Sequence, residues 1–172
     1  MTNQENPNNQ SVANQDIMSL YLHESAIQST LAKITMPVRL VLGFIKPSVD
    51  ISRASQQIKS IFPAATVILA SSAGLLCSRM GESILDNLYG NGLEGGDLTL
   101  LLMSNKIINN IHIATVKLGK EIPNPKDQIA AIEREVERIS IPFKISHQDT
   151  LAYTLVDGLS GAESFLMEAI YD

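Results

Sequence analysis

Two apolar runs separated by one amphipathic segment constrain the fold of this chain most strongly. Residues 38–45 and 66–70 consist mainly of Val, Leu, Ile and Ala, as buried strands do. Between them, apolar residues recur at helical spacing from Ile51 to Ile61, with Ser48 as the expected N-cap and Pro63 at the end. Because a strand, a helix and a strand in this order favour a parallel pair joined by a right-handed crossover, the sequence predicts an α/β fold.

The remaining apolar segments extend this start into a mixed sheet. Residues 98–103 and 111–118 predict an antiparallel β-hairpin, and Asn124-Pro125 marks the start of a helix with Asn as its cap. Leu151–Val156 is a further apolar run, and a helix opens after it near Ser160. We therefore expect a mixed β-sheet with flanking helices, in which the β-α-β start is followed by a hairpin, a helix and a further strand–helix unit.

The chain is expected to contain a tail, one domain and part of another. Residues 1–13 are rich in Asn, Gln and Pro, which predicts a disordered tail. The apolar residues from about 15 to 33 fit a helix, the first element of a domain that extends from 14 to 149. A strand–turn–helix unit is normally followed by another strand. We therefore expect residues 150–172 to begin a second, incomplete half.

Charge and cysteine content argue against several classes of function. The net charge is −5 and the 13 Lys and Arg residues are scattered, which argues against a nucleic-acid surface. The single cysteine rules out an internal disulfide and a thiolate zinc site. No apolar run is long enough to span a membrane, and the polar start differs from a secretion signal. A cytoplasmic protein without membrane insertion is therefore expected.

Two turns that follow apolar strands are the candidate ligand-binding segments. Ser71-Ser72-Ala73-Gly74 follows residues 66–70, at the place where open α/β sheets commonly bind ligands. Its hydroxyls and backbone N–H groups could hold an anion or a polar ligand, although the same small residues also suit a tight turn. Asp157-Gly158-Leu159-Ser160 follows the last strand, and its Asp suits either a functional carboxylate or a turn former.

The remaining polar residues show no clear reaction chemistry. Cys77 has no neighbouring His or Lys to activate its thiol and fits a small buried hydrophobe. The three histidines, His23, His112 and His147, lack metal-ligand spacing. His112 lies in a strand-like run, where it could be an edge-exposed histidine or an axial haem ligand in an apolar pocket. We expect no enzyme; the alternative is a hydrolase-type enzyme with Ser72 or Cys77 as nucleophile and His147 as base.

Several short motifs, taken in order, resemble the amino-terminal part of the FIST sensory domain. They are Val41-Leu-Gly-Phe44, Ile61-Phe-Pro63, Val67-Ile-Leu-Ala-Ser-Ser-Ala-Gly74, Leu88-Tyr89, Thr115-Val-Lys-Leu-Gly119, Asp157-Gly-Leu-Ser160 and Glu163-Ser-Phe-Leu-Met-Glu-Ala-Ile-Tyr171. FIST proteins carry a Ser-Thr-Ala-Gly-like turn where this chain has Ser71 to Gly74. The resemblance spans roughly residues 38–172, and the motifs are most similar to the bacterial branch that includes chemoreceptor-linked proteins and nitric-oxide-sensing haem proteins.

The resemblance implies a cytoplasmic small-ligand sensor without catalysis of its own. Such a sensor would bias an output partner, namely a histidine kinase, a cyclic-dinucleotide enzyme or a chemoreceptor. The likeness to the haem-binding branch makes His112 the candidate ligand of a haem iron and nitric oxide the candidate signal. The ligand is expected near the Ser71–Gly74 and Asp157–Ser160 turns, on one side of the sheet. A protein–protein interaction module without a small ligand, with its surface between residues 75 and 96, is the alternative.

Overall fold

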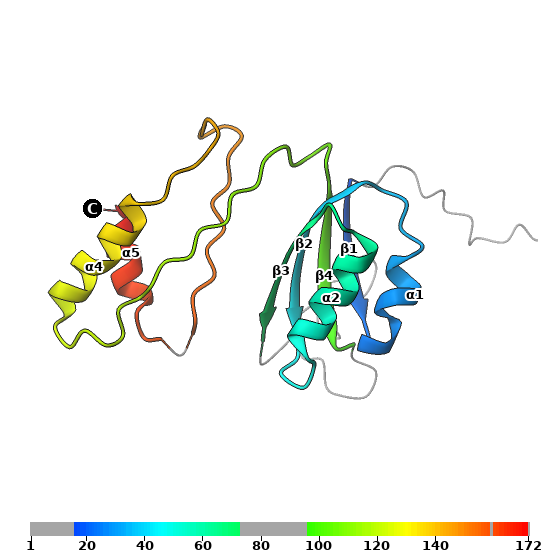
Figure 1. Ribbon diagram of the computed structural model, residues 1–172, viewed down its shortest axis with the longest axis horizontal. Helices are drawn as coiled ribbons and strands as arrows, with labels where there is room; N and C mark the ends of the chain where they lie inside the picture. Colours follow the sequence, from blue (N-terminus) through cyan, green and yellow to red (C-terminus); the bar gives the residue numbers. More distant parts are fainter. Residues whose placement is uncertain (1–15, 73–95, 159, 172) are drawn as a thin grey trace, which may run out of the picture. The chain divides into compact units, whose positions relative to one another are not determined.

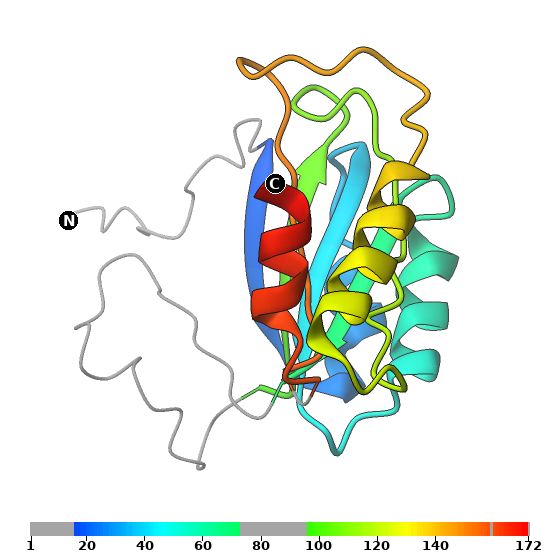
Figure 2. The same cartoon turned by 90° about the vertical axis from the view of Figure 1, so that its left-hand side faces the viewer.

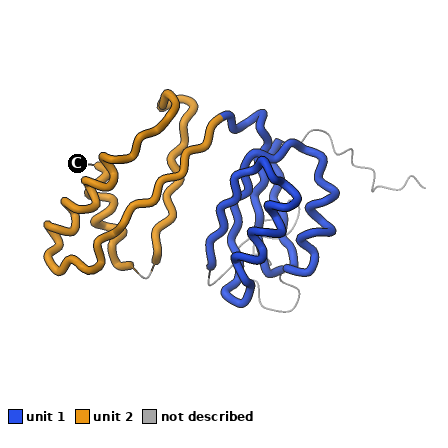
Figure 3. The backbone as a smooth tube through the Cα atoms, in the orientation of Figure 1, with its two compact units in different colours: residues 1–109 blue, residues 110–172 orange. Residues whose placement is uncertain are grey.

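The computed structural model describes residues 16–72, 96–158 and 160–171 (Figure 1). The chain divides into two compact units, unit 1 (residues 1–109) and unit 2 (residues 110–172) (Figure 3). Unit 1 contains a β-sheet with its crossover helix, and unit 2 contains two helices and the extended segments connected to them. This division, between residues 109 and 110, is not the domain boundary expected between residues 149 and 150, which stays a prediction.

Unit 1 is built on a mixed sheet that has four strands in the part of the chain the structure describes. They are β1 (Ile17–Leu22), β2 (Val38–Ile45), β3 (Thr66–Ser71) and β4 (Leu98–Ser104), in the order β1-β4-β2-β3. β2 and β3 are parallel, whereas β4 runs antiparallel to both β1 and β2. The α/β class, the mixed sheet and the β-α-β start predicted from the sequence are therefore confirmed.

Two helices cover one face of this sheet. α2 (Ile51–Ile61) connects β2 to β3, and α1 (Ile27–Leu31) follows the short 3-10 helix η1 (Glu24–Ala26) (Figures 1 and 2). Leu100 of β4, Ile27 of α1 and Ile58 of α2 are fully buried in the core between the sheet and these helices. Because alternate strand residues face this core, a slip of one residue would turn them outward, and the register is thereby fixed.

The N-terminus of α2 is capped by Asp50 rather than by Ser48. Asp50 Oδ1 accepts hydrogen bonds from the backbone N–H groups of Ser52 at 2.9 Å and Arg53 at 3.1 Å. These are two of the donors that a helix leaves unpaired at its start, and the negative charge also suits the helix dipole. The predicted helix is confirmed, and its cap lies two residues later than the predicted one, because Ser and Asp cap helices about equally well.

Residues 16–33 do not form the single helix that was expected from about residue 15 to residue 33. They contain β1, and only residues 24–31 are helical, as η1 and α1. The apolar residues Met18, Leu20 and Leu22 alternate with other residues, so the same stretch also fits a strand. β1 pairs with β4 along its whole length, and this long-range pairing decides in favour of the strand.

Residues 111–118 and 151–156 are extended but form no strand ladder, so the predicted hairpin and the predicted last strand are wrong. β4 was expected to pair with residues 111–118, yet β1 and β2 already occupy its two edges. A strand has hydrogen-bonding groups on two edges only, so no third strand can join β4. The extended segments expose large apolar side chains, including Ile113 (58% exposed) and Leu151 (86% exposed).

Unit 2 is organised around α4 (Pro125–Glu137) and α5 (Glu163–Tyr171), which lie side by side (Figure 2). The predicted cap of α4 is confirmed, because the Asn124 side chain accepts a hydrogen bond from Lys126 N at 3.0 Å. Ile132 of α4 and Leu166 of α5 are both buried. Gln128 is also buried, and its Nε2 donates a hydrogen bond to the carbonyl of Leu118 at 2.6 Å. This bond ties α4 to the extended segment before it.

Within the described ranges, no helix is both long and apolar enough to cross a membrane.

Candidate functional site

The carboxyl ends of β2 and β3 bring the first predicted turn to one edge of the sheet. The parallel register pairs Ile45 with Ser71, and Ser72 N donates a hydrogen bond to Ile45 O at 2.8 Å. Ser71 is exposed and Ser72 is partly buried. Ser71 is therefore the last residue of β3 and Ser72 the first residue beyond it, at the carboxyl ends of two parallel strands, which is where open α/β sheets commonly bind ligands.

Asp97 lies at the same edge and connects three strands there. Its backbone N–H donates to Leu22 O at 2.6 Å, at the end of β1, and its carbonyl accepts from Lys46 N at 2.9 Å, just beyond β2. Asp97 itself directly precedes β4. Because β1 and β2 both run antiparallel to β4, their carboxyl ends and the amino end of β4 coincide. Asp97 is thus fixed next to the end of β2, and β2 in turn lies next to the end of β3 that carries Ser71 and Ser72.

Polar groups from two places surround the Asp97 carboxylate: the start of η1 and the residue after β2. Its Oδ2 accepts a hydrogen bond from Glu24 N at 3.0 Å and lies 3.5 Å from His23 Nδ1. Its Oδ1 lies 3.9 Å from Lys46 Nζ. The Asp97 side chain is 31% exposed and that of Lys46 is 38% exposed, so the two charged groups remain accessible to a ligand. We call His23, Lys46, Ser71, Ser72 and Asp97 the carboxyl-edge cluster.

The chemistry of the carboxyl-edge cluster is suited to binding a small polar molecule. Lys46 supplies a positive charge, the two serines supply hydroxyl donors and acceptors, and His23 supplies a ring nitrogen. Sequence reasoning selected Ser71 and Ser72 but missed His23, Lys46 and Asp97. The available signals were weak: Lys46 directly follows an apolar run, and Asp97 directly precedes one.

The second predicted turn has a structural role that its geometry explains. Ser160 N donates to Asp157 O at 2.8 Å across Gly158, and Ala162 N donates to Ser160 Oγ at 3.2 Å just before α5. The Asp157 carboxylate pairs with Lys120 Nζ at 2.9 Å. The turn-forming interpretation of this segment therefore matches the structure. Whether these residues also contact a ligand stays a prediction.

The predicted site residues are divided between the two units. Ser71 and Ser72 belong to unit 1, whereas Asp157, Gly158 and Ser160 belong to unit 2. The idea that both turns contact one ligand therefore stays a prediction. Ala73, Gly74 and Cys77 lie outside the described residues, as does most of the surface predicted between residues 75 and 96.

His112 and His147 are both exposed residues of unit 2. Neither of two hollows among the described residues is lined by His112: one is lined by residues 37–39, 64, 105, 108 and 109, and the other by residues 117, 119, 121, 122, 131, 134, 135 and 138. A haem ligand needs an apolar pocket around its imidazole. Whether His112 binds a haem stays a prediction.

The comparisons with known proteins identify the family. A family model, the FIST N domain, matches residues 39–172. No curated protein and no solved structure matches the chain. The matched region begins in β2 and includes β3, β4 and both helices of unit 2. Because it covers well over half of the sequence, this chain belongs to the FIST N domain family, a family of sensory domains in signal transduction.

Proposed function

We propose that this chain is a cytoplasmic small-ligand sensor whose ligand binds at the carboxyl-edge cluster. The observation that carries the proposal is that Ser71, Ser72, Lys46 and Asp97 all lie at the edge of the sheet where β2 and β3 end, with Ser72 N bonded to Ile45 O and Lys46 beside Asp97. Membership of a sensory family supports the assignment of sensing rather than catalysis. The chain then needs no catalytic residue of its own.

The proposed mechanism is a shift between two arrangements of the carboxyl edge. The ion pair between Lys46 and Asp97 spans 3.9 Å and is partly exposed, so it contributes only about 0.2–1 kcal/mol. A ligand anion can therefore replace Asp97 as the partner of Lys46 at little cost. The carboxylate of Asp97 would then keep its hydrogen bond to Glu24 N, at the start of η1. The ligand stabilises whichever arrangement it contacts more strongly.

The output of this shift is proposed to be a signalling partner. The candidates are a histidine kinase, a cyclic-dinucleotide enzyme and a chemoreceptor. A coupling free energy of about 1–3 kcal/mol between ligand and partner would change partner affinity by roughly 5- to 150-fold. The same factor applies to the ligand, because coupling between two binding sites is reciprocal.

Native mass spectrometry of the protein as purified from cells tests the ligand site. The wild type is expected to carry a small-molecule adduct that is lost in Ser71→Trp, because the indole fills the edge of the cluster. Ser60→Trp is the matched control, since Ser60 is an exposed serine on α2, away from the cluster. An adduct that persists in Ser71→Trp would place the ligand elsewhere. A wild type without any adduct, together with undiminished capture of a partner by Ser71→Trp, would instead favour a pure interaction module.

A haem-based nitric oxide sensor is the narrower version of the proposal, and it has its own test. Protein purified with haem supplied during expression should show a Soret absorbance band, and His112→Ala should abolish it. His147→Ala is the control, because His147 is another exposed histidine of unit 2. A full band in His112→Ala would remove His112 from the haem hypothesis.

A further inference from the structure

The pairing of β2 with β4 is irregular at Arg39. Val38 pairs with Ser104 on β4, but Leu40 pairs with Met103, so two steps along β2 match one step along β4. Arg39 is therefore the extra residue of a β-bulge. Bulges re-aim a side chain and interrupt the ladder locally, and they are frequent next to binding sites.

The guanidinium of Arg39 has a buried donor without a partner. Its Nε is shielded from solvent and makes no hydrogen bond. Among the residues that the structure describes, no carboxylate forms an ion pair with Arg39. Asp16, which directly precedes β1, is engaged elsewhere, since it accepts a hydrogen bond from Ser104 Oγ at 2.9 Å and lies 3.6 Å from Lys106 Nζ. Native proteins rarely leave a buried charged donor without a hydrogen-bond acceptor, so we expect Arg39 Nε to bind one.

Arg39 lines a hollow that is large enough for a small molecule. The hollow has a volume of about 380 Å³ and is lined by Pro37, Val38, Arg39, Ala64, Asn105, Ile108 and Asn109. This volume falls within the range of ligand pockets, which is roughly 300–1,000 Å³. The lining contains one positive charge and two amide side chains but no acidic residue. Its charge and donors therefore suit an anion.

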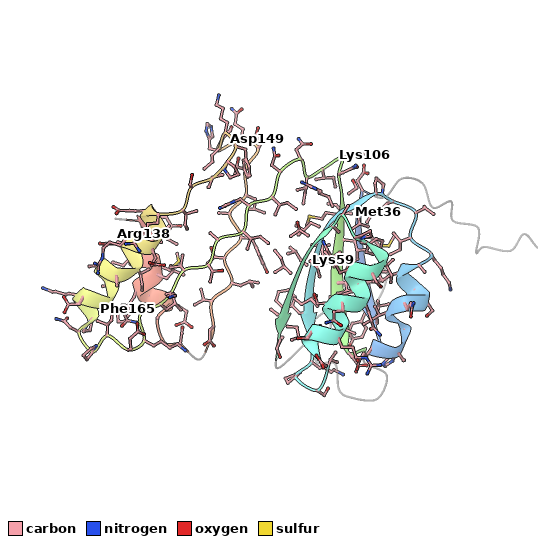
Figure 4. The ribbon with its side chains drawn as sticks, in the orientation of Figure 1. Met36, Lys59, Lys106, Arg138, Asp149 and Phe165 are labelled. Atoms are coloured by element: carbon pink, nitrogen blue, oxygen red, sulfur yellow. The ribbon has the colours of Figure 1, made fainter. Side chains whose placement is uncertain are left out.

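The walls of the hollow are held by hydrogen bonds that do not involve Arg39. Asn105 N donates to Pro37 O at 3.0 Å, and Ile108 N donates to Ser104 O at 3.2 Å. On the other side, Lys59 Nζ of α2 donates to Ala65 O at 2.6 Å, next to Ala64. Figure 4 shows Lys59 on α2 and Lys106 just beyond the end of β4. The pocket walls are thus fixed in the absence of a ligand, which lowers the cost of binding one.

We propose that this hollow binds the oxyanion group of a small ligand, a carboxylate or a phosphate, through Arg39. The planar guanidinium pairs with either group through two parallel N–H···O bonds. Asn105 and Asn109 contact the remaining polar atoms of the ligand through their amides. The site lies at the amino ends of β2 and β3, so it is separate from the carboxyl-edge cluster and does not depend on it. Because Asn109 is the last residue of unit 1, a bound ligand also restrains the chain directly before unit 2.

The test is an NMR titration of the full chain with inorganic phosphate and, separately, with acetate, at constant ionic strength. The Nε–H signal of Arg39 and the amide signals of Asn105 and Asn109 are expected to shift and to saturate. Arg39→Met should weaken binding at least about tenfold, because hydrogen bonds to a charged group are lost. Arg53→Met is the matched control, since the Arg53 side chain is 69% exposed on α2 and lies outside the hollow. Tighter binding of phosphate assigns a phosphoryl ligand, and tighter binding of acetate assigns a carboxylate.

A second variant keeps the test decisive if Arg39→Met does not fold. Asn109→Asp alters an exposed position and places a carboxylate beside Arg39, so it should abolish anion binding while the fold is retained. Shifts that grow linearly without saturation would overturn the proposal. Equal affinities in the wild type, Arg39→Met and Asn109→Asp would overturn it as well.

Discussion

Replacing Asp97 with alanine removes the carboxylate that accepts a hydrogen bond from η1 and lies beside His23 and Lys46, while the backbone bonds of residue 97 to Leu22 and Lys46 remain. The hydrogen bond from Glu24 N to the carboxylate is 3.0 Å long and partly buried, and its loss is expected to cost about 1–2 kcal/mol. The contacts with His23 and Lys46, at 3.5 and 3.9 Å, involve exposed side chains and add roughly 0.2–0.5 kcal/mol each. Asp97→Ala should therefore lower the free energy of unfolding of unit 1 by about 1–3 kcal/mol.

Asp97→Asn separates the two contributions. Its amide oxygen can still accept the hydrogen bond from Glu24 N, but the negative charge is gone. This variant should lose only about 0.5–1 kcal/mol, and that loss should shrink at high salt because exposed ion pairs are screened.

The measurement is urea unfolding followed through the amide signals of β4, which reports unit 1 separately from unit 2. Asp97→Ala should be clearly less stable than Asp97→Asn at every salt concentration. Equal stability of Asp97→Ala and the wild type would refute the role given to this residue. A loss in Asp97→Ala that disappears at high salt would show that ion pairing, not the hydrogen bond to Glu24, provides the stability.

Four further variants test the packing and capping described above, each by its melting temperature and urea midpoint. Asp50→Ala should cost about 1 kcal/mol through loss of the α2 cap, whereas Ser48→Ala should change little; the reverse order would contradict the observed cap. Gly43→Ala should destabilise unit 1 by about 1–3 kcal/mol, because a Cβ would lie 2.5 Å from a methyl group of Leu69 and 2.6 Å from one of Leu100; unchanged stability would mean that both side chains move aside freely. Gln128→Ala should cost unit 2 about 1–3 kcal/mol by leaving a carbonyl unpaired, and a neutral effect would show that water replaces the amide.

The parts of the fold that local sequence decides were predictable. Residues 38–45 form β2 with the predicted bounds, since a mainly apolar run of that length, interrupted only by Arg39 and Gly43, fits a buried strand. Asn124 caps α4 as expected, because Asn followed by Pro is a signal that needs no distant partner. Local chemistry also placed Ser71 and Ser72 at the end of β3.

The parts that depend on distant partners were not predictable. Residues 17–22 satisfy both a helical and an alternating pattern, and only the free edge of β4 selects the strand. The hydrogen bond between Asp97 and Glu24 joins residues 73 positions apart, so the residues next to Asp97 in the sequence do not predict it. The bulge at Arg39 likewise arises from the register between β2 and β4, which no single strand encodes.

Hydrogen exchange measured by mass spectrometry tests most directly whether the ligand lies at the carboxyl edge. The protein is compared as purified and after unfolding, dialysis and refolding, which removes a bound small molecule. Loss of the ligand should speed exchange in peptides that contain Lys46, Ser72 and Asp97, while the α4 peptides stay unchanged. Faster exchange confined to unit 2, with the carboxyl edge of β2 and β3 unaffected, would contradict the account.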